Sequence, residues 1–322
     1  VNQAENSIQL DRLLRGRSIR SSPNEQTTFR DSMSDTPSFN KLFDPVQLAT
    51  KEVEANIRSG NLKAAAEQLN ALQKEAPRDP RIFLMGASLA EAAGNPTAAL
   101  TAAERVVSLA PNWAPGIVEL AGVLIRQGQT ERALKEADRA VDLKPASLAV
   151  IELATSVANV AGDVERVGRY LRLAQSLAPD NLLIRRSLAY NDLDQGRLDQ
   201  AWSEFSALLS LEPDNPVVRL GHGRAALARR EMKAAAEDFA FLKALDPSDT
   251  TFAYYAAVAA GETPSTQPDA ITQSTFDGYA RRFDAHLVTA LKYRAPKRIA
   301  EIIRARYPNL DITVLDLGCG TG

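Results

Sequence analysis

The sequence predicts a mainly α-helical solenoid, followed by the first helices and the first strand of an α/β domain. Three observations support this prediction. Six prolines recur every 34 residues, glycines and alanines repeat in phase with them, and the last residues form an apolar, β-branched run before a glycine-rich loop. A repeat of this length accommodates one helix-turn-helix unit, and such units bury their apolar faces by stacking.

Residues 1–45 precede the repeats and show no sustained hydrophobic period. The segment is rich in Ser, Asn, Thr, Arg and Asp, and so few apolar side chains do not offset the entropy of ordering a chain. We therefore predict that residues 1–45 are disordered or loosely attached. Arginines interrupt the short apolar stretches between Asp11 and Arg20, so the segment lacks the continuous apolar core of a secretory signal.

The overall composition disfavours several classes of partner. The 322 residues contain 38 Lys and Arg against 40 Asp and Glu, a balance that favours neither nucleic acid nor an anionic membrane. Cys319 is the one cysteine and cannot form an internal disulfide, and no window contains the roughly 20 apolar residues of a membrane span. We therefore expect a cytoplasmic protein without nucleic-acid or membrane partners.

Three columns of residues define the repeated unit. Proline ends each unit, at Pro77, Pro111, Pro145, Pro179, Pro213 and Pro247. Glycine forms the second column, at Gly60, Gly94, Gly128, Gly162 and Gly196, with Arg230 in the sixth unit. Alanine forms the third, at Ala65, Ala99, Ala133, Ala201 and Ala235, with Val167 in the fourth unit. Glycine allows a turn between two helices, proline ends the second helix, and a small residue allows the helices to cross closely.

These columns place six helix pairs in succession, at 46–79, 80–113, 114–147, 148–181, 182–215 and 216–249. The first and fourth units depart most from the shared pattern. Residues 250–260 follow the last unit and form one more helix, equivalent to the first helix of each pair. We expect this seventh first helix to cap the open end of the stack. The predicted solenoid therefore covers residues 46–262.

In two units a phenylalanine follows the alanine column by four residues, at Phe205 and Phe239. A 34-residue unit that ends in proline and has this Ala-x3-Phe spacing resembles the tetratricopeptide repeat (TPR). The resemblance implies a concave groove, lined by the first helices, that binds a peptide or a protein partner.

The groove positions of the family hold an uneven mixture of residues here, namely Leu84, Ser88, Val118, Gly122, Glu152, Ser156, Asn159, Arg186, Tyr190, Arg224 and Tyr254. Apolar residues and glycine in the second and third units break the Lys, Asn and Arg pattern of repeats that hold the carboxylate tails of heat-shock chaperones. The late cluster of Arg186, Tyr190, Arg224 and Tyr254 suits a ligand with negative charge and some apolar surface. A solvated face with ordinary surface charges is the alternative interpretation.

A linker and a second domain follow the solenoid. Residues 263–274 are rich in Pro, Ser and Thr, a composition typical of a flexible linker. Residues 276–307 then have the spacing of apolar side chains that is typical of helices, and Pro296 divides this stretch into two.

The last twelve residues form a predicted strand and a glycine loop. Residues 311–317, DITVLDL, read as a buried parallel strand, and the glycines after them allow backbone to approach a ligand. The G-x-G-x-G spacing, with Asp316 two positions before the first glycine, resembles motif I of class I S-adenosylmethionine-dependent methyltransferases. The upstream segment STFDGYARRFDAHLVTALKYRAP is similar to the entry helix of bacterial predicted methyltransferases that carry amino-terminal TPRs. The resemblance implies that residues 275–322 are the incomplete start of a Rossmann-like domain.

The same resemblance implies roles for individual residues toward S-adenosylmethionine. Gly318, Cys319 and Gly320 would run beneath the methionine and ribose portions of this cofactor. Asp316 would fix the loop and meet the amino group of the cofactor, directly or through water. Tyr279 would cover the pocket.

Three further features invite a chemical interpretation but have simpler explanations. Phe283 lies near Tyr279 in sequence and is better explained by helix packing. Cys319 is a small residue between two glycines, and nothing in the spacing brings His286 beside it as a base. His222 occupies a core position of the sixth first helix, so we expect a packed or hydrogen-bonded histidine.

The printed sequence ends at Gly322, within the predicted loop. One strand cannot satisfy its backbone hydrogen bonds without neighbouring strands. We therefore expect residues 1–322 alone neither to bind the cofactor nor to transfer methyl groups, and the complete protein to be a methyltransferase whose array recruits a substrate or partner. An adaptor with a secondary terminal domain is the alternative, and the glycine spacing disfavours a nicotinamide-dependent oxidoreductase.

Overall fold

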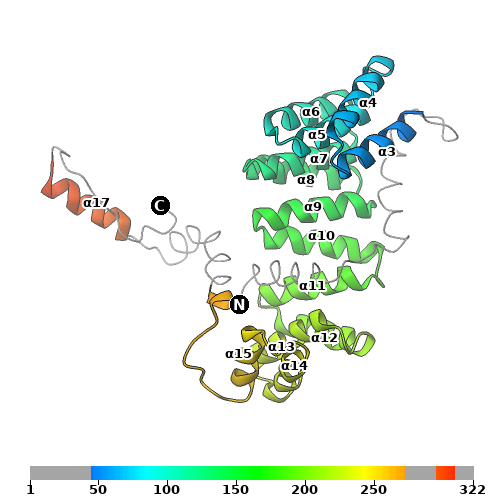
Figure 1. Ribbon diagram of the computed structural model, residues 1–322. Coiled ribbons are helices and arrows are strands. Elements are labelled where there is room, and N and C mark those ends of the chain that lie inside the picture. The colour runs from blue at the N-terminus through cyan, green and yellow to red at the C-terminus, as the bar shows by residue number, and fades with distance from the viewer. Residues whose placement is uncertain (1–44, 273–294, 309–322) are drawn as a thin grey trace. The chain divides into compact units, whose positions relative to one another are not determined.

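The computed structural model describes residues 45–272 and 295–308 (Figure 1). Within these residues helices are present and no β-strand occurs. One compact unit ends at Pro213 and contains α3 (Pro45–Arg58), α4 (Leu62–Glu75), α5 (Pro80–Ala92), α6 (Pro96–Leu109), α7 (Ala114–Arg126), α8 (Thr130–Leu143), α9 (Leu148–Ala161), α10 (Val164–Leu177), α11 (Leu182–Asp194) and α12 (Leu198–Leu211). From Asp214 onward the chain forms α13 (Pro216–Arg229), α14 (Met232–Leu245), α15 (Thr250–Ala259) and α17 (Ala295–Arg306).

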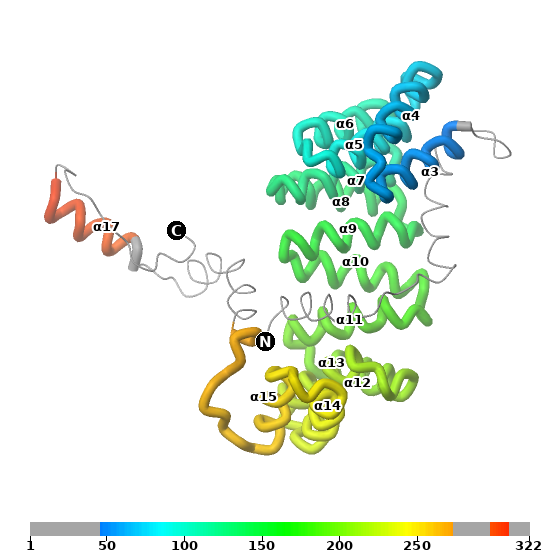
Figure 2. The backbone as a smooth tube through the Cα atoms, in the orientation of Figure 1, coloured from blue at the N-terminus to red at the C-terminus, as the bar shows by residue number. Residues whose placement is uncertain are grey.

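The predicted solenoid of helix pairs is confirmed. Each predicted unit contains two helices, from α3 with α4 in the first to α13 with α14 in the sixth. Between α3 and α12 every helix packs against the next one in sequence, as the tube in Figure 2 traces. First helices also contact one another, since α5 packs against α3 and α7, and α7 packs against α9. The predicted seventh first helix is α15, which packs against α14.

A polar side chain starts most of the first helices. Asn181 accepts hydrogen bonds from the backbone amides of Leu183 and Ile184, and so satisfies two donors that have no partner inside α11. The equivalent residues of other repeats, which cap in the same way, are Asp79, Ser147, Asn215 and Asp249. These caps fix where each first helix begins after the proline that ends the preceding repeat.

The alanine column lies at the centre of each helix pair. Its alanines are all 0% exposed, and Val167 in the fourth unit is 4% exposed. This burial agrees with the predicted close crossing of the two helices. Apolar side chains form one cluster around Val53, Leu69 and Trp113 and a larger one that runs from Ala87 to Leu188.

The turn between the two helices of a repeat requires a positive φ angle. The column glycines adopt φ angles from 69° to 79° there, and Arg230 adopts 65° in the sixth repeat. Glycine enters this left-handed region without steric cost, whereas an L-residue with a Cβ atom does not. The backbone turn is therefore conserved in shape across the repeats even where its sequence signal is lost.

Replacing Arg230 with glycine should raise the free energy of unfolding by about 1 kcal/mol, because it removes the left-handed strain. The Arg230 side chain is exposed, so little packing is lost. Urea unfolding of the variant measures the effect, and Gly196→Arg is the matched reverse substitution, with the opposite sign expected. Equal stability of Arg230→Gly and the parent protein would contradict the prediction.

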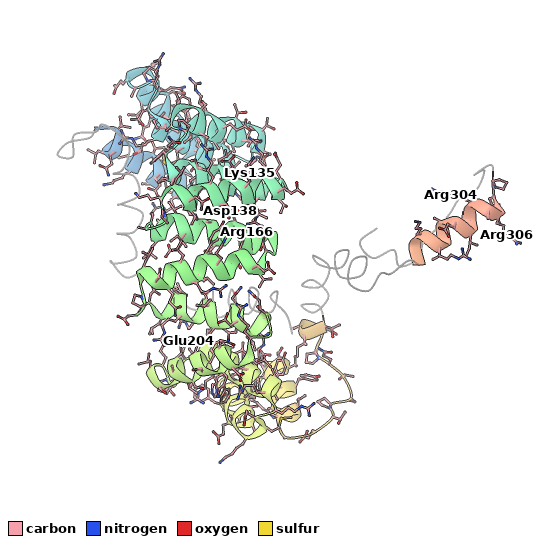
Figure 3. The ribbon with its side chains drawn as sticks, turned by 180° about the vertical axis from the view of Figure 1, so that it is seen from behind. Lys135, Asp138, Arg166, Glu204, Arg304 and Arg306 are labelled. Carbon is pink, nitrogen blue, oxygen red and sulfur yellow. The ribbon has the colours of Figure 1, made fainter. Side chains whose placement is uncertain are left out.

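Asp138 joins two neighbouring second helices, α8 and α10 (Figure 3). Its carboxylate accepts hydrogen bonds from Arg166 Nε at 3.0 Å and from the Tyr170 hydroxyl at 2.5 Å, and it also pairs with Arg169. Partial burial by itself raises the pKa of Asp138, but the hydrogen bonds from Tyr170 and Arg166 outweigh burial and lower it. The carboxylate therefore stays ionised and holds the third and fourth repeats together.

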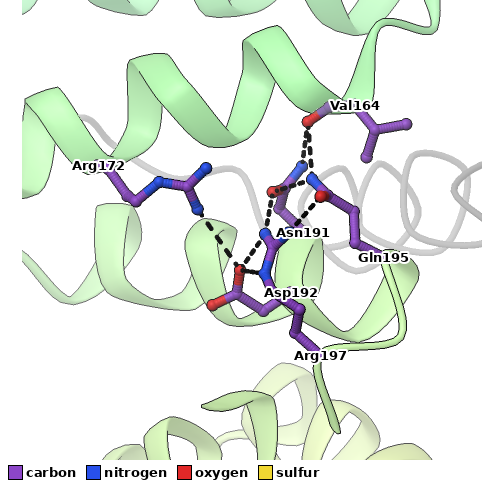
Figure 4. A network of polar contacts seen from close by, with 6 residues as sticks. All are labelled: Val164, Arg172, Asn191, Asp192, Gln195 and Arg197. Atoms are coloured by element: carbon purple, nitrogen blue, oxygen red, sulfur yellow. Dashed lines mark hydrogen bonds and ion pairs between the residues drawn. The ribbon is translucent and has the colours of Figure 1, made fainter.

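Asn191 is the centre of a polar network between α10 and α11 (Figure 4). Its amide nitrogen donates to the Val164 carbonyl at 2.9 Å, and its oxygen accepts from Gln195 Nε2 at 2.9 Å and from Arg197 Nη2 at 3.3 Å. Asn191 is 4% exposed, so these bonds are shielded from water. A Cβ atom at Gly168 would lie 2.5 Å from the Asn191 oxygen, which explains a glycine inside α10.

The second predicted domain is described only in part. The helix α17 begins beside Pro296, as predicted for the second of the two helices after the linker, and its Ile299 and Ile302 are more than half exposed. The predicted segment 1–45 is described only at Pro45, and the first of those helices, the strand 311–317 and the glycine loop lie outside the described residues. Among the residues that are described, every helix is too short or too polar to cross a lipid bilayer.

Candidate protein-binding face

The helix α9 has one buried side and one open side. Its buried side packs in the larger apolar cluster and consists of Val150, Ile151, Ala154, Thr155, Val157 and Ala158. Its other side consists of Glu152, Leu153, Ser156, Asn159 and Val160, all of which are exposed. A helix with 3.6 residues per turn places these five side chains on one stripe. We call this stripe, together with the exposed Leu183 of the next first helix α11, the open face.

The open face exposes large apolar side chains. Leu153 is 37% exposed, Val160 54% and Leu183 51%. At the position of Glu152 the two preceding repeats have buried apolar side chains, because Leu84 on α5 is 5% exposed and Val118 on α7 is 1% exposed. Single exposed apolar residues are ordinary, but three on the same stripe of successive first helices indicate a surface for a partner.

The structure places the four residues of the predicted late cluster in different surroundings. Arg186 forms an ion pair with Glu212 at 3.3 Å, so its charge is balanced within its own repeat. Tyr190 is buried, and its ring meets the ring of Phe205 edge to face at 4.9 Å between centroids. These contacts give Arg186 and Tyr190 roles within the fifth repeat.

The other two residues of that cluster, Arg224 and Tyr254, lie in the part of the chain that begins at Asp214. Arg224 on α13 is 5% exposed, and Tyr254 on α15 meets Tyr255 edge to face at 5.6 Å. Because the two units are described separately, the common anionic-ligand site of these four residues stays a prediction.

Of the six residues that form the open face, Glu152 is the charged one. Partial burial raises the pKa of Glu152, and burial raises the pKa of Glu119 on α7, which the nearby Glu91 raises further. Arg126 lies close enough to Glu119 to act against this shift. However, Arg126 already donates two hydrogen bonds to Glu91, from Nε at 2.7 Å and from Nη2 at 2.9 Å.

His222 is packed and hydrogen bonded, as predicted. It is 8% exposed, and its Nδ1 atom lies 2.5 Å from Asp238, which is 2% exposed. Asp238 also accepts a hydrogen bond from Arg219 at 3.1 Å, and Arg219 lies over the ring of Phe241. This buried cluster joins α13 to α14 and has the character of a structural contact.

The predicted cofactor residues Asp316, Gly318, Cys319, Gly320 and Tyr279 all lie outside the described residues, as do Phe283 and His286. Their arrangement therefore stays a prediction. Within residues 45–272 and 295–308, no group of three or more His, Cys, Asp or Glu side chains is placed to hold a metal ion.

Sequence and structure comparisons agree on the helical array. The sequence profile of the tetratricopeptide repeat matches residues 50–113 and 186–250, and no curated protein matches the chain. A structure from the functional characterisation of Pseudomonas aeruginosa pilF aligns with 66% of this chain and 96% of its own, at 16% identity and a TM-score of 0.53. YrrB, described as a TPR protein with an unusual peptide-binding site, aligns with 60% of this chain and 97% of its own, at 16% identity and a TM-score of 0.49.

At 16% identity, the alignment with the pilF structure shows a common fold and no more. The profile match covers the first two and the last two helix pairs, and it leaves out all of α7 to α10, where the open stripe of α9 lies. The match identifies residues 50–113 and 186–250 as tetratricopeptide repeats, and the 34-residue period and the left-handed turns continue through the helix pairs between them.

Proposed function

We propose that the array binds a peptide, or an extended segment of a protein partner, against the open face. TPR arrays are interaction scaffolds whose stacked repeats present an extended binding surface. The observation that supports this site is the exposure of Leu153, Val160 and Leu183 on one stripe, beside polar groups that can orient a ligand. Leu84 and Met85 of the second repeat and Val118 of the third are buried at positions equivalent to Glu152 and Leu153, so the fourth repeat offers the more accessible apolar surface.

Selection from a displayed peptide library against the intact chain tests the proposal. We expect the selection to enrich peptides. Their affinity for the double variant Leu153→Ser, Val160→Ser should be at least about tenfold lower, because both substitutions remove apolar contact area. The control variant Leu143→Ser, Leu177→Ser changes two residues of similar exposure, 43% and 40%, on second helices. Selected peptides that bind the face variant and the control equally well would refute this site.

We further propose, from the sequence, that the complete protein is an S-adenosylmethionine-dependent methyltransferase. The support is the strand and loop of 311–322 with Asp316 before the glycines, and the helical stretch that precedes them. Asp316, Gly318, Cys319, Gly320 and Tyr279 are the residues that would hold the cofactor. Catalysis would rest largely on bringing the sulfonium methyl group and an oxygen, nitrogen or carbon nucleophile together in line.

Calorimetry with S-adenosylmethionine distinguishes this proposal from an adaptor function. The product of the complete reading frame should bind the cofactor, and Asp316→Ala should abolish binding. Residues 1–322 alone should show no binding, because one strand does not make a sheet. If the complete product binds no cofactor while the peptide-binding face is active, the adaptor function is the correct one.

A further inference from the structure

We propose that the ligand of the open face is a cationic and aliphatic segment, in which Lys or Arg side chains lie next to Leu, Ile or Val. This inference rests on the proposed peptide-binding function and adds the chemical class of the ligand. It differs from the anionic ligand that the sequence suggests for Arg186 and Arg224, because the structure adds the charge pairing and the exposed surface of the fourth repeat.

The charge balance of the first helices supports a positively charged ligand. Arg126 is engaged by Glu91 in two hydrogen bonds, and Arg186 is engaged by Glu212. Glu119 and Glu152 have no ion pair among the described residues at salt-bridge distance. The positive groups of α7 and α11 are thus engaged by their own partners, whereas Glu152 on α9 is left for a cation from outside.

The surroundings of these carboxylates point in the same direction. Loss of hydration raises the pKa of both Glu119 and Glu152, so the ionised form of each is less well solvated than a free carboxylate. A bound Lys or Arg would stabilise the ionised form, and an anionic ligand would be repelled by it. Glu152 lies on the exposed stripe, where an incoming side chain can reach it.

The aliphatic part of the ligand follows from the neighbours of Glu152. Leu153 precedes Val160 by two turns of α9, a separation of about 10 Å along the helix axis. An extended ligand covers that length with about three residues. Ser156 lies between them on the same stripe, with Glu152 and Asn159 beside it, so apolar and polar contacts alternate along the face. A short segment can therefore place aliphatic groups on Leu153 and Val160 and a cation at Glu152.

Fluorescence anisotropy with three labelled decapeptides tests the inference on the intact chain. One probe alternates Lys and Leu, the second alternates Glu and Leu, and the third alternates Lys and Ser. We expect the Lys-Leu probe to bind at least about tenfold more tightly than either of the others, because only this probe matches both the charge and the apolar surface. Its affinity should fall as salt concentration rises.

Matched variants show whether the probe uses the open face. Glu152→Gln should weaken the Lys-Leu probe by about two- to fivefold, the usual size of an exposed ion pair. Glu165→Gln changes an exposed carboxylate on the second helix α10 and should leave affinity unchanged. Leu153→Ser should weaken binding more than Glu152→Gln does, and unchanged thermal unfolding by circular dichroism shows that each variant is folded.

Each contrary outcome has a separate meaning. Tighter binding of the Glu-Leu probe, still lost in Leu153→Ser, would overturn the cationic ligand and leave the peptide-binding function intact. If the Lys-Leu probe binds Glu152→Gln and Leu153→Ser with the same affinity as the parent protein, the assignment of the ligand to this face is overturned. Displacement of the probe by a synthetic peptide of residues 1–44 would overturn the proposal that the ligand belongs to another protein. The ligand would then be the chain's own arginine-containing segment. Failure of all three probes, together with a library that yields no peptide, would overturn the proposed function itself.

Discussion

Replacing Phe205 with alanine should lower the free energy of unfolding by about 3–5 kcal/mol, the largest effect that we expect from a single substitution. Phe205 on α12 is 0% exposed, and its ring packs edge to face against Tyr190 on α11. Truncation removes a buried aromatic ring and leaves a cavity between the two helices of the fifth repeat. The aromatic pair is lost as well, which adds to the cost of the cavity.

Urea unfolding measured by circular dichroism provides the free energy for this variant. The matched control is Leu211→Ala on the same helix, whose side chain is 59% exposed and should contribute less than about 1 kcal/mol. Repeat arrays unfold partly repeat by repeat, so hydrogen exchange should show the loss concentrated in α11 and α12. Similar losses from Phe205→Ala and Leu211→Ala would mean that Phe205 is not the packing centre of its repeat.

Replacing Gly116 with alanine should destabilise the array by about 1–3 kcal/mol, although alanine favours helix formation. An added Cβ atom at Gly116 would lie 2.5 Å from Val106 Cγ1 and 2.7 Å from Trp113 Cε3. Val106 is 0% exposed and Trp113 is 4% exposed, so neither side chain has free space to move into. The overpacking should separate α6 from α7.

The opposite result is expected for Gly86→Ala, which is the matched control. Gly86 lies inside α5, and an added Cβ atom there would meet only Ala102 Cβ, at an ordinary distance of 4.0 Å. This variant should gain up to about 1 kcal/mol from the better helix propensity of alanine. Thermal or urea unfolding of the two variants measures the difference, and a shift of the same sign in both would show that packing at Gly116 is not limiting.

The array itself could be predicted from the sequence because one signal repeats many times. Ala65, Ala133 and Ala201 occupy equivalent sites, and each is 0% exposed, so every unit reports the same packing constraint. The left-handed turn at Arg230 shows the same redundancy, since the five glycines of the column determine a backbone shape that the sixth repeat keeps without glycine. Local sequence alone would not have predicted a positive φ angle there.

The open face could be predicted only in part: Glu152, Ser156 and Asn159 are groove positions expected from the resemblance, whereas the exposure of its apolar residues was not expected. Leu153 and Val160 are apolar residues in a helical pattern, and such residues are expected to be buried. Met85 on α5 occupies the position equivalent to Leu153 and is 3% exposed, so identical periodicity accompanies opposite burial. Only the packing of neighbouring helices decides which stripe is covered. The pairing of Arg186 with Glu212 is equally invisible in sequence, because 26 residues separate them.

The polar links on either side of α9 make the open face a stiff surface. Asp138 joins α8 to α10, and Asn191 joins α10 to α11. The helix α9 packs on both α8 and α10. Amide hydrogens of α9 can therefore exchange with solvent only when these polar links break together. The segment from α8 to α11 should then exchange its amide hydrogens as one cooperative block. A ligand that meets such a preorganised surface loses little affinity to ordering the protein. Slow exchange in α9, despite its exposed side chains, is the signature of this rigidity.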